Sequence, residues 1–138
     1  MKKLPHFLVV VGIVIRDQKF FIAQRDFNLH MGGRWEFPGG KVEKEEKLLD
    51  ALSRELFEEI DIIPTKTEHF CTFNYGYDIK TVTLECFLVH EFEGEPKGKE
   101  GQITRWVPFQ EISHYQFPDA NQPLIERIKQ RFISSSGV

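Results

Sequence analysis

The stretch from Gly40 to Ile62 combines a glycine-containing turn with a helix that is acidic on one face and apolar on the other. Residues three and four positions apart share a helix face, so Glu55 should lie above both Glu58 and Glu59. Arg54 precedes Glu58 by four positions and can pair with it, which would fix the direction of that carboxylate. The apolar face predicts packing on a core and consists of Leu48, Leu52, Leu56 and Ile60.

Clustered carboxylates of this kind suit a divalent cation. Like charges destabilise an isolated helix, whereas Mg²⁺ is held by a few carboxylates together with water and substrate phosphates. A solvated, salt-bridged helix face is the commoner explanation of a lone R-E-x-x-E-E. The longer pattern reads Gly, five residues, Glu46, seven residues and R-E-apolar-x-E-E, and composition alone would produce it in about one in a million chains of this length. The pattern therefore favours a metal site that acts on a phosphate ester.

These residues resemble the signature of the Nudix hydrolases, which cleave nucleoside diphosphates linked to another group. The match is complete except that the family usually has Gly where Asp61 stands. That position ends the helix, where a left-handed conformation is common. Asp adopts this conformation more readily than most residues, although its charge opposes the helix dipole. We therefore expect the departure to affect local stability and not the chemistry.

The resemblance also implies a fold, a metal and catalytic groups. The fold would be α/β, the Nudix α/β/α sandwich with a mixed β-sheet between helices. The metal would be Mg²⁺, with Mn²⁺ as a possible substitute, and its implied ligands are Gly39, Glu55, Glu58, Glu59 and Glu100. Glu55, Glu58 and Glu100 are the predicted catalytic residues; Glu55 and Glu100 both qualify as the base, and the sequence does not choose between them. Glu46 is expected to stabilise the turn before the helix and not to bind metal.

The whole chain is compatible with this resemblance. Its 138 residues predict one domain, residues 1–138, with a sizeable core. A net charge of −3 argues against a nucleic-acid polymer as a partner, because such partners favour a basic face. A small nucleotide substrate remains compatible with that charge.

The first apolar run needs a separate explanation. Residues Phe7–Ile15 follow Lys2 and Lys3, which is somewhat like a signal peptide. The run is too short to cross a membrane, lacks a small-residue cleavage site and passes directly into charged residues. We therefore interpret it as a buried strand and expect no membrane partner.

The cysteine content points to a reducing compartment. Cys71 and Cys86 are too few for a disulfide framework, and their spacing suits no zinc site. We expect both to be reduced packing residues, and we predict a cytoplasmic protein that is monomeric.

Periodicity and turn residues predict the order of the elements. Strands are expected at Phe7–Ile15, Lys19–Gln24, Trp35–Phe37, Thr67–Tyr77, Thr81–Glu91 and Ile103–Val107. Turn or loop residues predict breaks at 16–18, 28–34, 38–40, near Asp78, and at 94–101. Helices are expected from about Glu46 to Ile60 and from Ala120 to Phe132, with a helical turn at Gln110–Tyr115. Strands interleaved with two helices imply a mixed sheet covered on both faces.

The resemblance extends over nearly the whole chain and looks closest to the MutT group, which acts on oxidised purine nucleoside triphosphates such as 8-oxo-dGTP. It is carried by His30–Lys41, Gly94–Gln102 and Phe117–Ile125. In the group, an Asn in the F-P-x-A-N setting contacts the purine edge, and Asn121 occupies that position. An Asn amide presents a donor beside an acceptor; since oxidation turns N7 of guanine into an N–H donor, an acceptor placed there prefers the oxidised base. The alternative is that Asn121 caps the last helix.

The resemblance also implies further substrate contacts, at residues that match substrate-binding positions of the family. They fall at Arg25, His30, Glu36, Phe37, Pro38, Gly39 and Lys80. Phe37 and Pro38 would line the base pocket, with core packing as the plain alternative. Lys80 stands where some relatives carry Arg. Glu100 matches a Glu on a mobile loop, and the flanking Gly98 and Gly101 would let that loop deliver a carboxylate.

The implied reaction is attack of water on the β-phosphorus of 8-oxo-dGTP, which releases 8-oxo-dGMP and pyrophosphate and cleans the nucleotide pool of a mutagenic precursor. Two other functions stay open. One is a pyrimidine-directed pyrophosphatase acting on CTP or 5-methyl-dCTP, against which Asn121 argues. The other is a catalytically silent module that binds nucleotides or a protein, which we would expect to have lost its metal-ligating Glu residues.

Overall fold

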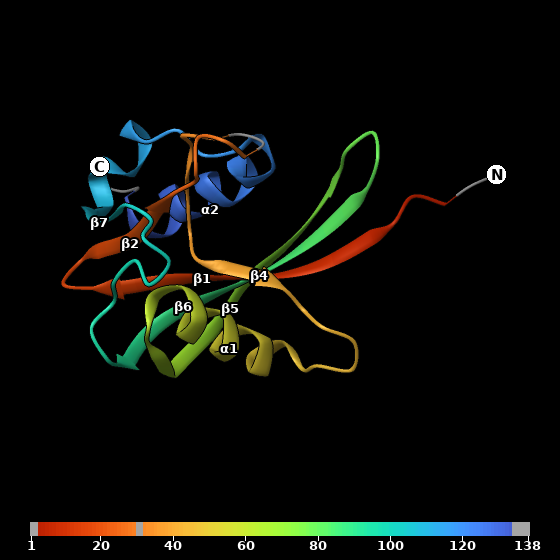
Figure 1. The fold of residues 1–138 in the computed structure, drawn as a ribbon. Coiled ribbons are helices and arrows are strands. Elements are labelled where there is room, and N and C mark those ends of the chain that lie inside the picture. Colours follow the sequence, from red (N-terminus) through yellow and green to blue (C-terminus); the bar gives the residue numbers. More distant parts are fainter. Residues whose placement is uncertain (1–2, 30–31, 134–138) are drawn as a thin grey trace.

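A computed structural model of the chain describes residues 3–29 and 32–133. The described residues form a seven-stranded sheet with α1 on one face and α2 on the other (Figure 1). The strand order is β3-β2-β1-β6-β5, with β4 paired to β1 and β7 paired to β2. β1 and β6 are parallel, and the other pairs are antiparallel. The expected α/β sandwich with a mixed sheet is confirmed. The strands are β1 His6–Arg16, β2 Lys19–Gln24, β3 Trp35–Glu36, β4 Gly39–Lys41, β5 Ile63–Gly76, β6 Thr81–Glu93 and β7 Thr104–Pro108.

Strand β1 is the centre of the sheet and contributes to both cores. Val10 and Val14 are fully buried in the core beneath α1, whereas Val11 and Ile13 are buried in the core beneath α2. This alternation follows from the two-residue period of a strand. The first apolar run is therefore a buried strand, as predicted. No helix in the described ranges is long and apolar enough to cross a membrane.

The two helices pack their apolar faces on opposite sides of the sheet. α1 (Leu48–Ile60) buries Ala51, Leu52, Leu56 and Ile60, and α2 (Gln122–Phe132) buries Leu124, Ile125 and Ile128. α1 begins at Leu48 and not at Glu46, because Glu45 has a left-handed φ of 65° and Lys47 is extended. α2 begins at Gln122 because residues Asp119–Asn121 form a short 3₁₀ turn, η2. A second 3₁₀ turn, η1 (Phe109–His114), lies where a helical turn was expected.

One strand was missed by the prediction. The segment Gly39–Lys41, expected to be part of a turn, forms β4 and pairs with residues Val9–Val11 of β1. Gly39 lies so close to β1 that an added Cβ would overlap the Val10 carbonyl. The glycine therefore permits a close backbone approach, which reads as a turn in the sequence alone.

The hairpin of β5 and β6 is the longest in the sheet and extends away from the helices (Figure 1). β5 begins four residues before its predicted start and ends one residue short of its predicted end, whereas β6 runs two residues beyond its predicted end. Cys71 and Cys86 are opposite each other in this pair, and both are free and buried, in agreement with the prediction.

Candidate active site

The carboxylates of Glu55 and Glu59 on α1 face strand β4. An added Cβ at Gly40 would overlap the carboxylate of Glu55, whose Oε1 would lie only 2.6 Å away. The glycine of the sequence pattern is therefore required by the side chain fifteen positions later, which fills the space that a larger residue would occupy.

Arg54 organises the acidic groups around it. Its Nε and Nη2 donate to Glu46 at 2.8 and 2.9 Å, and its Nη1 donates to Glu55 at 2.8 Å and to Glu58 at 3.3 Å. Nη2 also donates to the Lys41 carbonyl at 3.0 Å. The predicted pair with Glu58 is present, but the shorter bonds go to Glu46 and Glu55. Arg54 thus ties the turn before α1 to the acidic face of the helix.

Glu46 stabilises the turn, as expected. The backbone N–H of Glu43 donates to its carboxylate at 2.9 Å. The guanidinium of Arg54, followed by this backbone bond, lowers the pKa of Glu46 to about 2. Glu46 is therefore charged at neutral pH and fully engaged by groups of the turn and helix.

Glu59 lies among acidic neighbours. Burial, followed by the charges of Glu55 and Glu36, raises the pKa of Glu59 well above its ordinary range, and a hydrogen bond from the Gly39 backbone opposes the rise. A partly buried carboxylate beside two others gains most from a positive partner. The donors are hard oxygens, which suit Mg²⁺ or Mn²⁺, so the residues fit a divalent cation.

The side chains are not arranged as a finished metal cage. Within residues 3–29 and 32–133, no three His, Cys, Asp or Glu side chains are placed to hold one ion as they stand. Arg54 bonds to both Glu55 and Glu58. A cation would therefore have to compete with the guanidinium for these two carboxylates.

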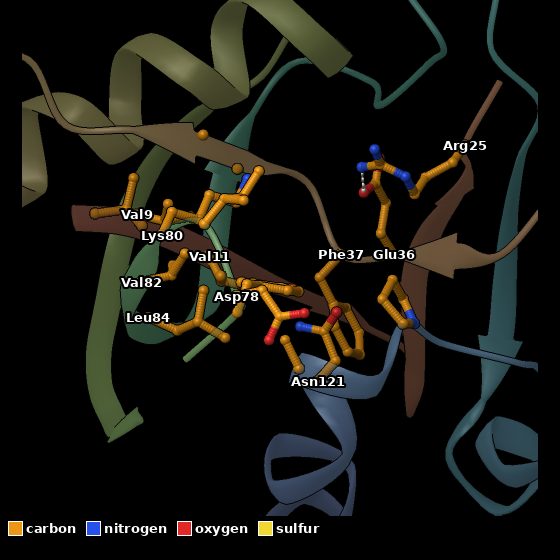
Figure 2. Close-up of a pocket in the computed structure, with 17 residues that line it drawn as sticks. Val9, Val11, Arg25, Glu36, Phe37, Asp78, Lys80, Val82, Leu84 and Asn121 are labelled. Carbon is orange, nitrogen blue, oxygen red and sulfur yellow. Dashed lines mark hydrogen bonds and ion pairs between the residues drawn. The ribbon is translucent and has the colours of Figure 1, made fainter. Parts of the chain in front are cut away.

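A cavity of about 720 Å³ opens beside this acidic region (Figure 2). Phe37, Val82 and Leu84 supply apolar walls, and Asn121 projects into the space. Asn121 directly precedes α2, but its side chain makes no capping hydrogen bond. The capping alternative thus lacks the contact on which it depends, and the carboxamide faces the cavity.

A second cavity, of about 500 Å³, is lined by Glu59 and Glu100. Arg25 and Glu36 line both cavities, and their ion pair of 3.0 Å is drawn in Figure 2. Burial raises the pKa of Glu36, although the bond from Arg25 opposes the change. The pair forms a shared wall between a mainly apolar cavity and an acidic one.

The cavities bring together most of the predicted site. The first contains Arg25, Glu36, Phe37, Gly39, Lys80 and Asn121, and the second contains Arg25, Glu36, Glu59 and Glu100. Pro38 is buried, accepts a hydrogen bond from Gly12 at 2.8 Å and lines neither cavity. Glu58 is more exposed than Glu55, and neither residue lines either of these two cavities. The predicted residue His30 lies outside the described residues.

Sequence reasoning missed one wall of the first cavity. Tyr77, Asp78 and Ile79 reach it from the turn between β5 and β6, where the Tyr77 N–H donates to the Lys80 carbonyl at 2.8 Å. The break near Asp78 was predicted and Lys80 was expected to contact the substrate, but the contribution of the three residues before Lys80 was not predicted. The parallel pairing of β1 with β6 brings this turn to the site. No local sequence pattern predicts which strands pair.

Comparison with known proteins agrees with this geometry. The family model of the NUDIX domain matches residues 10–127, and the chain belongs to the Nudix hydrolase family. Nudix hydrolases generally need a divalent metal.

Two curated relatives define the immediate similarity. An 8-oxo-dGTP diphosphatase of Escherichia coli (strain K12) is 39% identical over 130 residues, which cover 94% of this chain and 98% of the relative. A CTP pyrophosphohydrolase of the same organism is 36% identical over 118 residues, which cover 86% of this chain and 87% of the relative. A solved structure from work on the MutT proteins of Aliivibrio salmonicida and Vibrio cholerae has a TM-score of 0.82 and 37% identity, covering 92% of this chain and 99% of the other.

Proposed function

We propose that this Nudix hydrolase converts 8-oxo-dGTP and water into 8-oxo-dGMP and pyrophosphate, and so keeps an oxidised purine out of newly made DNA. The observation that carries the proposal is the position of Asn121. Its side chain, unused as a cap, enters an apolar cavity that adjoins the carboxylates of α1. The 39% identity to an 8-oxo-dGTP diphosphatase supports the same conclusion.

The base would be selected by hydrogen bonding in an apolar setting. The Asn121 oxygen would accept from N7–H of the oxidised purine, while its amide group would donate to O6. Unmodified guanine has a lone pair at N7 and would leave the Asn121 oxygen unpaired, at a cost of about 1–3 kcal/mol. Phe37 would pack against the purine ring.

The triphosphate would extend toward the acidic side of the site. Glu55, Glu58, Glu59 and Glu100, with the Gly39 carbonyl, are the groups that would hold Mg²⁺ or Mn²⁺. A divalent cation, when bound, neutralises phosphate charge and lowers the pKa of a bound water. Arg25 and Lys80 would supply positive charge to the phosphates.

Proton transfer requires a carboxylate close to the attacking water. Glu55 and Glu100 are the candidates; Glu58 would support the metal and the orientation of Arg54. The attack would break the bond between the α-phosphate's bridging oxygen and the β-phosphorus, and the leaving nucleoside monophosphate would take the freed electron pair. We extend the proposal to a monomeric, single-domain enzyme of the cytoplasm whose partner is the nucleotide and not a nucleic-acid polymer.

The test is pyrophosphate release with Mg²⁺ from 8-oxo-dGTP, dGTP and CTP measured in parallel. We expect kcat/KM for 8-oxo-dGTP to exceed the other two by at least about tenfold, the effect of a single lost hydrogen bond. Highest activity on CTP would instead favour the pyrimidine-directed function, which the 36% identity to a CTP pyrophosphohydrolase keeps as the second candidate. No turnover of any nucleotide would indicate a silent binding module.

A further inference from the structure

Asp61 ends α1 in an unusual way for a charged residue. Its backbone is left-handed, with φ 65° and ψ 36°, and its N–H donates to the Phe57 carbonyl at 3.1 Å. Glycine is the least strained residue in this conformation. A carboxylate at this end of a helix also lies beside unpaired carbonyls, which repel it. Some other contact must therefore compensate for the side chain of Asp61.

Two lysines of the loop between β6 and β7 provide that contact. Lys99 Nζ lies 3.5 Å from Oδ1 of Asp61, and Lys97 Nζ lies 3.6 Å from Oδ2. Lys99 also donates to the Phe57 carbonyl at 3.3 Å and sits 4.0 Å from the centre of the Phe57 ring. The Asp61 carboxylate is thus a counter-ion for both cations, one of which is also held by the helix end.

The same loop bonds to α1 through its backbone. The N–H of Lys97 donates to the Ile60 carbonyl at 3.1 Å, and the N–H of Lys99 donates to the Glu59 carbonyl at 3.0 Å. These bonds satisfy carbonyls that the end of a helix leaves unpaired. Gly94, with φ 97°, begins the loop against the Asp61 carbonyl, where a Cβ would come within 2.7 Å. Residues 94–101, the Glu100 loop, therefore dock on the end of α1.

The docked loop carries a predicted catalytic residue. Glu100 follows Lys99 directly, and its N–H donates to the Gln102 side chain at 2.9 Å. Gln102 in turn donates to the Glu59 carbonyl at 3.1 Å. Glu100 and Glu59 line the same cavity. The position of Glu100 relative to the carboxylates of α1 is thus set by how firmly the loop is docked.

We propose that Asp61 is a positioning residue for the reaction: through Lys97 and Lys99 it holds the Glu100 loop on α1 and so sets the place of Glu100 in the site. The role of Glu100 in hydrolysis rests on the proposed function; the anchoring of the loop does not. This proposal departs from the expectation that Asp61 affects local stability alone, and the two differ in the turnover that they predict for Asp61 variants.

The first variant for the test is Asp61→Asn, in the full-length protein. Asn tolerates the left-handed conformation as Asp does, so only the charge is lost. Asp61→Gly is the second variant, because it keeps the helix end and removes the whole side chain. The matched control is Glu126→Gln, which removes a lysine–carboxylate pair of 3.5 Å with Lys129 on the far helix.

Hydrogen–deuterium exchange of peptides from residues 95–102 gives a readout that needs neither metal nor substrate. Loss of two exposed ion pairs should speed exchange there by about two- to tenfold in both Asp61 variants, with no change in the control. Exchange that stays at the wild-type rate in both variants would overturn the proposal, even if their melting temperatures fall.

Turnover gives the second readout. With 8-oxo-dGTP, kcat should fall by about two- to tenfold in Asp61→Asn while KM stays nearly constant. Added NaCl should reduce the wild-type rate toward that of the variant and change the variant less, because salt screens exposed pairs. An unchanged kcat beside faster loop exchange would also overturn the positioning role.

A replacement variant and a second substrate keep the experiment decisive if Asp61→Asn does not fold or 8-oxo-dGTP is not cleaved. If Asp61→Asn does not fold, Lys97→Gln takes its place in both measurements, because it removes one of the two ion pairs from the loop side and leaves the contacts of Lys99 with Phe57 intact. If the wild type does not hydrolyse 8-oxo-dGTP, the proposed function fails, but exchange and the turnover of whichever nucleotide is cleaved still test Asp61.

Discussion

The carboxylate of Glu55 rests on the backbone of Gly40, in the space where any other residue would place its Cβ. The two positions belong to different elements, β4 and α1. Their contact sets the distance between the carboxylates of the helix and the glycines of the strand. It explains why a glycine and a glutamate so far apart in the sequence form one pattern.

Gly40→Ala should therefore displace Glu55 and lower kcat by about 100-fold, as expected for a misplacement of roughly 1 Å at a reacting centre. The protein should remain folded, because the colliding group is a side chain that can turn. Initial rates with 8-oxo-dGTP and a melting curve test this together. Gly76→Ala is the matched control, since nothing lies within 4 Å of a Cβ added there; equal activity in both variants would contradict the role given to the contact.

Glu58→Gln and Glu59→Gln should each lower kcat by several orders of magnitude without unfolding the protein. Each change removes a carboxylate that we assign to metal binding and transition-state stabilisation, and the amide that replaces it is similar in size, so the fold should be kept. Single-turnover rates and thermal melts measure the two effects separately. Near-normal turnover of both variants, beside a normal Glu126→Gln control, would exclude the assigned metal site.

Glu46 should make stability depend on pH in a defined direction. Its pKa is lowered from 4.5 to about 2 in the folded state by Arg54 and the Glu43 backbone. The stability that Glu46 adds is therefore fully present above pH 4.5 and is lost as the pH falls through about 2. Urea unfolding of the wild type and of Glu46→Gln, from pH 7 to pH 2, should show a difference in unfolding free energy that shrinks in that window. A difference that stays constant with pH would mean that Glu46 acts by packing and not by charge.

The sequence was sufficient for the parts of the site that lie within one element. Glu55, Glu58 and Glu59 share a face of α1 because helical geometry fixes it, and β1 follows from its continuous apolar run, which is buried on both faces of the sheet. Arg54 illustrates the limit. Its pairing with Glu58 was predictable from a four-residue spacing, but its closer bonds to Glu46 depend on a turn whose course is set by tertiary contacts.

Contacts between distant elements could not be predicted in this way. Nothing local indicates that Glu36 of β3 lies close enough to raise the pKa of Glu59, or that Lys97 and Lys99 reach Asp61. These contacts arise from sheet order and loop docking, which depend on the burial of the whole chain. Local periodicity in the sequence does not reveal these contacts.

Asn121→Ala should erase most of the preference for the oxidised base while hydrolysis of dGTP changes much less. Asn121 lines the first cavity and has no predicted contact with phosphate, so its loss removes differential binding and leaves the carboxylates in place. A lost helix cap would cost about 1 kcal/mol of stability, but the Asn121 side chain makes no capping bond, so the melting temperature should hardly change. The measurement is kcat/KM for 8-oxo-dGTP and dGTP, alongside a melting curve.

Asn74→Ala, which removes an Asn of β5 outside both cavities, should keep the wild-type ratio. A wild-type ratio in Asn121→Ala as well would remove the main structural reason for assigning oxidised purines to this site.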